Sequence, residues 1–167
     1  CLMQAPWIDL AIIIAASGAG LMAGVYFAFS GFIMRAFDQL GAERATDAMN
    51  AINEVILRSW FMPLFFGSTL LYAVLAVVAL IDSDLAGRWW LFAAGVIYVV
   101  GMFVCTAAFN VPLNNRLAEN REDPTARSQM WQLYYRNWTR WNSLRAVCSL
   151  LALILSLQAL IAQAQVI

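Results

Sequence analysis

Histidine and lysine are both missing from this chain, whose ten basic residues are all arginines. The absence of histidine removes the commonest metal ligand and the commonest general base at neutral pH, so we expect neither a metal site nor a bound cofactor. Ten carboxylates bring the formal net charge to zero. Phosphate binding needs a clustered excess of positive charge, so the sequence excludes nucleic acid as a partner.

Charged residues of either sign are also scarce. They make up 12% of the sequence, whereas hydrophobic residues make up 63%. Soluble domains are about a quarter charged and about half apolar, so the main solvent of this chain is lipid. A membrane-spanning helix takes about 20 residues, and four such helices with modest connections use nearly all of residues 1–167. The sequence therefore predicts a single all-α transmembrane domain surrounded by membrane lipids.

Long apolar runs mark the expected membrane-spanning helices. They cover about residues 8–34, 60–81, 89–110 and 140–162. A short polar turn separates the second run from the third, which predicts a tight antiparallel hairpin. Asp123-Pro124 resembles a helix N-cap followed by proline at the first helical position, so we expect the last helix to begin there, ahead of its apolar part. The expected fold is an integral membrane four-helix bundle.

Two further patterns concern how these helices pack. Apolar residues recur at helical spacing between the first and second runs, at Met49, Ile52, Val55 and Ile56. This spacing predicts a short amphipathic helix lying at the membrane interface after the first span. In the first run, Gly20 and Gly24 form a small-xxx-small pair, a pattern that lets helix backbones approach closely in lipid.

The arginines are distributed unevenly among the connections. The first and third connections carry most of them, namely Arg35, Arg44, Arg58, Arg116, Arg121, Arg127, Arg136 and Arg140. The turn between the second and third helices carries Arg88. By the positive-inside rule, the first and third connections face the cytoplasm, while both termini and the hairpin turn face outward. The expected location is a bacterial inner membrane.

The three cysteines predict little disulfide chemistry. Cys105 and Cys148 lie inside apolar runs, where a thiol packs as a small residue. Cys1 differs because cleavage in front of a cysteine that then becomes lipidated would anchor the N-terminus on the outer face. The alternative for Cys1 is a chain that has simply been trimmed.

Most polar residues at membrane depth gather at one end of the third and fourth helices. The candidate site residues are Asn110, Asn114, Trp138, Trp141, Asn142 and Arg145. A charged group at this depth is costly unless satisfied, which makes Arg145 a functional candidate. These side chains could hold a carbonyl, phenolate or quinone oxygen while the indoles stack on an aromatic ring. The alternative is an arginine that snorkels to the interface beside an ordinary aromatic belt.

Several segments also resemble a known family. Residues 110–114 (Asn-Val-Pro-Leu-Asn) and 138–145 (Trp-Thr-Arg-Trp-Asn-Ser-Leu-Arg) are similar to the signature of the anthrone-oxygenase-like small membrane proteins. The resemblance extends to residues 27–30 (Phe-Ala-Phe-Ser) and 60–62 (Trp-Phe-Met). It covers nearly the whole chain in the same order, and it implies the same four-helix bundle.

The resemblance implies insertion of oxygen at an activated ring carbon without a metal or flavin. The substrate loses a proton to give a stabilised carbanion that reacts directly with oxygen. In this chain, Arg145 would be the cation for the enolate or phenolate oxygen, with Asn142 and Asn110 as hydrogen-bond donors. Trp138 and Trp141 would form the walls. Many relatives have histidine directly after the Trp-Asn pair, where this chain has Ser143, so the base is not identified.

Two functions therefore stay open. The first is a small membrane enzyme or binding protein for a hydrophobic aromatic or quinone-like molecule. The second is a non-catalytic accessory subunit of a larger membrane protein complex, which the serine in place of histidine favours. A transporter or channel would call for charged residues deep in several helices or for broken helices, and the sequence has neither pattern.

Overall fold

The computed structural model describes residues 6–120 and 123–165, and nearly all of them are helical. The elements are α1 (Pro6–Ala28), the π-helix η1 (Phe29–Ile33), α2 (Met34–Gln39), α3 (Ala42–Ile56), α4 (Phe61–Ile81), α5 (Arg88–Tyr98), the π-helices η2 (Val99–Val104) and η3 (Thr106–Asn110), α6 (Val111–Glu119) and α7 (Pro124–Ala164). Within the described ranges there is no strand. The predicted all-α class is confirmed.

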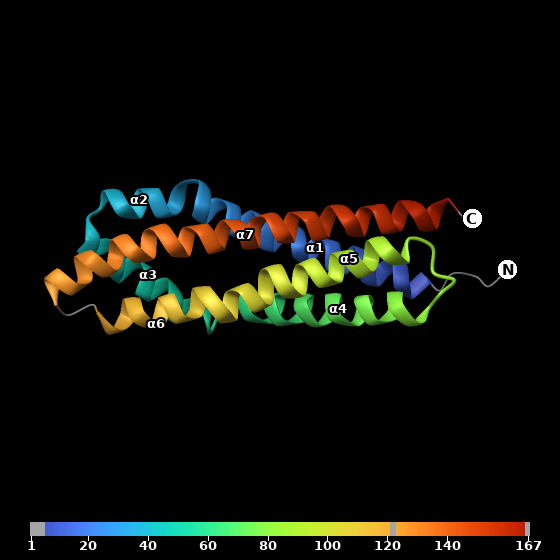
Figure 1. The fold of residues 1–167 in the computed structure, drawn as a ribbon, viewed down its shortest axis with the longest axis horizontal. Coiled ribbons are helices and arrows are strands. Elements are labelled where there is room, and N and C mark those ends of the chain that lie inside the picture. Colours follow the sequence, from blue (N-terminus) through green and yellow to red (C-terminus); the bar gives the residue numbers. More distant parts are fainter. Residues whose placement is uncertain (1–5, 121–122, 166–167) are drawn as a thin grey trace.

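Several of these elements join end to end, which leaves four long rods. The rods that are long and apolar enough to cross a membrane are Pro6–Gln39, Phe61–Ile81, Arg88–Glu119 and Pro124–Ala164. They run side by side along the bundle, and α3 lies at one end (Figure 1). At 1.5 Å per residue α7 is about 60 Å long, roughly twice the hydrocarbon thickness of a bilayer. The predicted four-helix membrane bundle is confirmed, and three of its rods extend beyond the predicted spans while Phe61–Ile81 matches its own.

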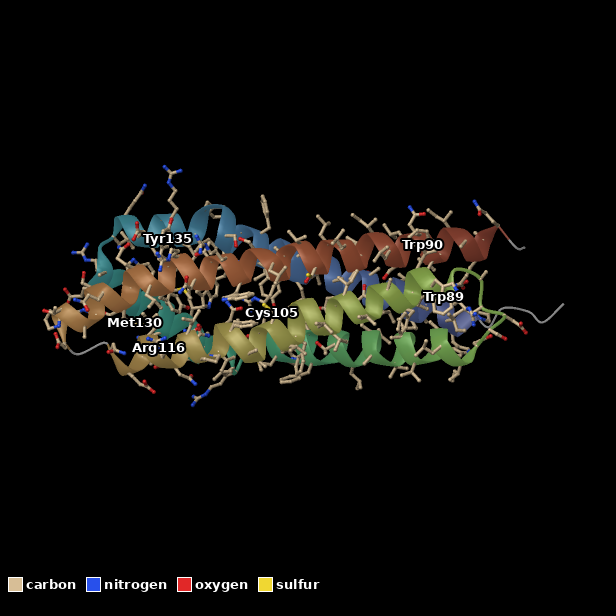
Figure 2. The ribbon with its side chains drawn as sticks, in the orientation of Figure 1. Trp89, Trp90, Cys105, Arg116, Met130 and Tyr135 are labelled. Carbon is tan, nitrogen blue, oxygen red and sulfur yellow. The ribbon has the colours of Figure 1, made fainter. Side chains whose placement is uncertain are left out.

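The hairpin between α4 and α5 closes the other end of the bundle. Its turn ends at Gly87, which has a φ of 72° in the left-handed region. A Cβ at this position would lie 2.9 Å from the backbone oxygen of Ala159 on α7, so both the conformation and the space require glycine. Trp89 and Trp90 lie at this end, and Arg116 and Tyr135 lie toward the opposite one (Figure 2). The predicted tight hairpin is confirmed.

The short helix α3 is amphipathic as predicted, and its buried face includes Met49 but not Val55. It packs on α6 and α7 through Ala45, Thr46 and Met49, all of which have no exposed surface. Val55, which the apolar spacing assigns to the buried side, is 68% exposed. The buried apolar residues of α3 therefore pack against other helices of the protein rather than against lipid.

The third connection is shorter than the sequence suggests. The helix does not end at Asn110 but continues through α6, because Pro112 falls at the junction between a π-helix and an α-helix. The hydrogen-bond register changes at such a junction, so a residue without an N–H costs less there. The helical rod ends at Glu119, close to the start of α7.

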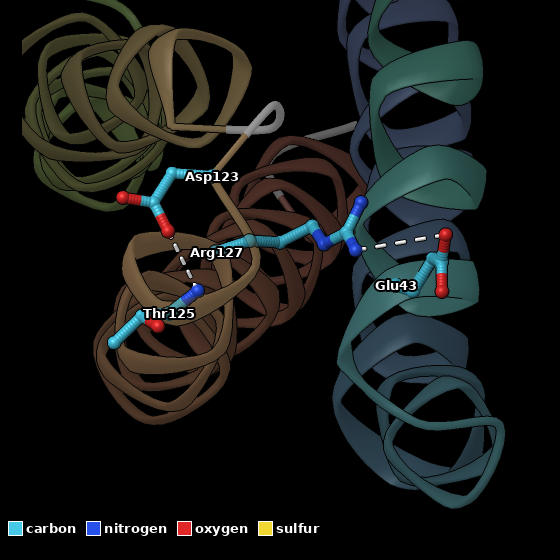
Figure 3. Close-up of polar contacts among 4 residues, drawn as sticks. All are labelled: Glu43, Asp123, Thr125 and Arg127. Atoms are coloured by element: carbon cyan, nitrogen blue, oxygen red, sulfur yellow. Dashed lines mark hydrogen bonds and ion pairs between the residues drawn. The ribbon is translucent and has the colours of Figure 1, made fainter.

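The predicted N-cap of α7 is confirmed. The Asp123 Oδ1 atom accepts hydrogen bonds from the backbone N–H groups of Thr125 at 2.8 Å and Ala126 at 3.3 Å. One turn later, Arg127 Nη2 lies 3.5 Å from Glu43 Oε1 of α3 (Figure 3). These contacts fix where the last helix begins and connect it to α3.

The closest helix contacts are not at the predicted glycine pair. Gly24 is exposed, and a Cβ there would meet nothing within 4 Å. The tight contact lies instead between α4 and α5, where a Cβ on Gly95 would be 2.6 Å from Ala76 Cβ and 2.7 Å from Tyr72 O. Gly101 lies similarly close to Cys148 of α7. Among the helical glycines, those with the closest contacts therefore lie on the hairpin's second helix.

Candidate functional site

A cavity of about 500 Å³ lies at the α3 end of the bundle, with walls from α1, α3, α4, α7 and the rod that contains η3 and α6. Its lining is mostly apolar and includes the aromatic rings of Phe29, Phe61, Phe65, Phe66 and Phe103. This volume and lining are typical of sites for small hydrophobic molecules. The polar groups in the wall therefore decide what chemistry it can support.

The predicted site residues mostly meet at this cavity. Those that line it are Asn110, Asn114, Trp138, Asn142 and Arg145. Trp141 lies outside the lining, and its ring stacks on Phe109 with a centroid separation of 3.8 Å and an interplanar angle of 6°. Cys1 lies outside the described residues. The third and fourth rods thus bring together side chains that are far apart in sequence, as the sequence analysis expects.

Arg145 is buried inside the bundle rather than extended to the interface, since only 5% of its surface is exposed. Its Nη2 donates to Asn142 Oδ1 at 2.8 Å, and its Nη1 donates to Thr106 Oγ1 at 3.2 Å. The guanidinium carbon lies 4.3 Å from the ring centroid of Tyr26 and 5.4 Å from that of Trp138. Cation–π contacts of this kind offset part of the cost of burying the charge.

No carboxylate in the described part of the chain forms an ion pair with this arginine. Among the described residues, the ion pair that forms is Arg127 with Glu43, far from Arg145 in sequence and in the bundle. A guanidinium keeps its charge in proteins and carries five N–H groups. The Arg145 guanidinium in the cavity wall therefore carries a positive charge that no described carboxylate pairs with, which favours an oxygen that bears or develops negative charge.

Asn142 holds Arg145 in place. Its Nδ2 donates to the backbone oxygen of Tyr26 and to Ser30 Oγ, both at 2.6 Å, while its Oδ1 accepts from Arg145. Ser143 Oγ also donates to Ser30 Oγ, at 2.9 Å. Because both N–H groups of Asn142 are used within the protein, its geometry fits a positioning role better than direct contact with a ligand.

The other two asparagines are also tied to α7. Asn110 Nδ2 donates to the Trp138 backbone oxygen at 3.3 Å, and Tyr134 OH donates to Asn114 Oδ1 at 2.9 Å. The Trp138 ring in turn stacks near Tyr134, with their centroids 5.7 Å apart. The wall that carries the polar groups is therefore held by contacts between two rods.

Several buried polar atoms around the cavity have no protein partner. They are Asn50 Nδ2, Asn110 Oδ1, Trp138 Nε1 and Arg145 Nε. Such atoms are rare in folded proteins, and each calls for an explanation such as a ligand, an ion or water. Their concentration in the side chains of one cavity supports a polar ligand group at this site.

Sequence reasoning missed part of the wall. Tyr26 could have been noticed as a hydroxyl in an apolar run, directly before the segment at 27–30 that carries the family resemblance. Asn50, Asn53 and Glu54 of α3 also line the cavity, and their spacing does indicate a polar helix face. The pattern cannot tell whether such a face meets water or a cavity.

Three π-helices border the site. Phe29 belongs to η1, Phe103 belongs to η2, and Thr106 and Asn110 belong to η3. Short π-helical segments within α-helices occur frequently at functional sites, because the wider turn changes the direction of its side chains. Here they lie in the two rods whose side chains surround Arg145.

A comparison with known protein families finds a match to this chain. Residues 56–155, more than half of the chain, match the family model described as anthrone oxygenase. The matched range contains α4 to α6 and most of α7, including Asn110, Asn142 and Arg145. Among curated proteins and among solved structures, none matches the chain. The family suggested by the sequence segments is thus confirmed, and the chain belongs to the anthrone oxygenase family.

Proposed function

We propose that the protein binds a flat, hydrophobic aromatic ketone or quinone-like molecule in this cavity, with the ligand's oxygen beside Arg145. The observation that carries the proposal is the buried guanidinium in the cavity wall, which has no carboxylate partner among the described residues. The phenylalanine rings offer apolar surface for the ligand's ring system. A cavity of about 500 Å³ has room for a small multi-ring molecule.

The reaction we propose is oxygenation of an anthrone-type ketone, the substrate class in the family's name. Loss of a proton from its methylene carbon gives an anion whose charge rests largely on the ketone oxygen. Arg145 stabilises this anion more than the neutral ketone, which is the condition for accelerating the step. The anion reacts with molecular oxygen: one oxygen atom becomes the new ring carbonyl, and the other leaves as water with the two methylene hydrogens.

Binding of anthrone to the purified protein in lipid nanodiscs tests this proposal. We expect saturable quenching of tryptophan fluorescence at about one ligand per protein, and protein-dependent uptake of oxygen when air is admitted. Absence of saturable binding would contradict the proposal. If the protein instead purifies in fixed ratio with a larger membrane complex and binds no anthrone, an accessory role replaces it.

The two neighbouring tryptophans are expected to differ in their effect on binding. Trp138→Leu removes an aromatic side chain that lines the cavity and contacts Arg145, so anthrone affinity should fall roughly tenfold. Trp141→Leu is the matched control, because Trp141 packs on Phe109 outside the cavity, and its affinity should stay within about twofold of the wild type. Binding isotherms of both variants measure the difference, and equal losses would contradict the assigned ligand position.

We further propose that the α3 end of the bundle faces the cytoplasm, since the arginine-rich connections lie there. Ser83 in the hairpin turn and Ser128 near the start of α7 are both exposed. In right-side-out membrane vesicles, a membrane-impermeant maleimide should label Ser83→Cys but not Ser128→Cys, with the unsubstituted chain as the background. The reverse labelling pattern would mean that the α3 end of the bundle faces outward.

A further inference from the structure

One acidic side chain lines the cavity in the part of the chain that the structure describes, and it is Glu54 of α3. Glu54 lies one helical turn after Asn50, so the two share a face of α3, and both line the cavity. Arg145 enters the wall from α7. No ion pair joins Glu54 to Arg145, so the negative and the positive charge are both available to a molecule between them.

Among the side chains that the structure describes, no other one offers a base at this position. Tyr26 donates its hydroxyl to Met102 Sδ at 3.4 Å and lies under the Arg145 guanidinium. Ser143, which stands where many relatives have histidine, donates to Ser30 Oγ and to the Thr139 backbone oxygen. Ser143 is not among the residues that line the cavity.

We propose that Glu54 is the base that removes the proton from the ligand's acidic carbon, an inference that rests on the function proposed above. The Glu54 carboxylate takes the proton, and the electron pair of the broken C–H bond spreads over the ring system to the ketone oxygen. The negative charge thereby moves from Glu54 to an oxygen beside Arg145, where the guanidinium stabilises it. The step needs no oxidant, because the ligand only loses a proton.

The position of Glu54 also allows it to act repeatedly. Its side chain is exposed while the residue lines the cavity, and with the α3 end facing the cytoplasm, as proposed above, it borders both the ligand and water. After accepting the proton, it releases the proton to solvent and becomes a carboxylate again. The buried contacts of Ala45 and Met49 fix the helix that carries it.

Exchange of anthrone's methylene hydrogens for deuterium tests this step alone. The wild type, Glu54→Gln and Glu54→Asp are placed in nanodiscs in heavy water without oxygen, and exchange is followed by NMR. We expect Glu54→Gln to slow protein-dependent exchange about 100-fold or more, with anthrone affinity within about threefold of the wild type. Glu54→Asp keeps the carboxylate and should give an intermediate rate.

Asp47→Asn is the matched control, since Asp47 is an exposed carboxylate on the same helix that does not line the cavity. Its exchange rate should equal that of the wild type. The inference is overturned if Glu54→Gln exchanges the methylene hydrogens at the wild-type rate. It is also overturned if the wild-type protein binds anthrone but does not exchange these hydrogens. A wild type that does not bind anthrone overturns the proposed function itself, so the two failures are distinguishable.

Discussion

The Arg145→Met variant is expected to bind anthrone at least about 30-fold more weakly than the wild type. Hydrogen bonds to a charged group contribute roughly 1.5–3 kcal/mol, and about 1.4 kcal/mol corresponds to a tenfold change in affinity. The guanidinium has no carboxylate partner among the described residues, so the ligand's oxygen is its expected counterpart. Methionine is an unbranched, uncharged side chain that replaces the aliphatic part of the arginine, which retains much of the packing.

The fold should tolerate this change. Replacing a buried charge with an apolar side chain of similar volume is often neutral for stability, although Asn142 Oδ1 loses its donor. We expect the midpoint of thermal unfolding in detergent to move by only a few degrees. Binding isotherms in nanodiscs measure the effect on the ligand.

Two further variants test whether the loss of affinity comes from the charge and donor geometry at position 145. Arg145→Lys keeps the charge but not the planar fork of donors, so it should lose less affinity than Arg145→Met. Arg140→Met removes an exposed arginine that does not line the cavity and should bind like the wild type. If Arg145→Met bound anthrone with unchanged affinity, the assignment of the ligand site to this cavity would be wrong.

The largest loss of stability is expected from Gly95→Ala. The added Cβ would lie 2.6 Å from Ala76 Cβ and 2.7 Å from the backbone oxygen of Tyr72, so α4 and α5 would have to separate. Overpacking of this kind costs about 1–3 kcal/mol, which lowers the midpoint of thermal unfolding by roughly 2–12 °C in a protein of this size. The sign is opposite to the usual effect of alanine in an exposed helix, where it stabilises relative to glycine.

Gly67→Ala is the matched control on α4, since a Cβ at Gly67 would meet nothing within 4 Å. Its unfolding midpoint should equal that of the wild type or rise slightly. The measurement is thermal unfolding of both variants in the same detergent. Equal midpoints for the two variants would mean that α4 and α5 are not in close contact at Gly95.

Much of the fold can be predicted from the sequence because lipid imposes simple requirements. Apolar runs long enough to cross a bilayer must be helical, and the Asp123-Pro124 signal locates the start of α7. The same physics identifies Arg145, Asn142 and Asn110, because polar groups at membrane depth need partners. These three side chains do gather in one wall.

The rest depends on which face of each helix points inward, and an apolar sequence does not encode this. Lipid-facing and buried positions are both hydrophobic, so Gly24 looked as suitable for packing as Gly95. For the same reason, Trp138 and Trp141 could not be separated, although one lines the cavity and the other packs on Phe109. The polar face of α3 gave no sign of whether it meets water or a cavity.

The apolar lining of the cavity has a consequence for how affinity is measured. A molecule that suits five phenylalanine rings also dissolves in acyl chains, since the same hydrophobic driving force acts in both places. The mole fraction of ligand in the bilayer, rather than its total amount in the sample, then sets the fraction of protein that is occupied. Doubling the lipid at fixed total ligand would roughly halve occupancy at low saturation without any change in the protein. Variants can therefore be ranked only at one lipid-to-protein ratio.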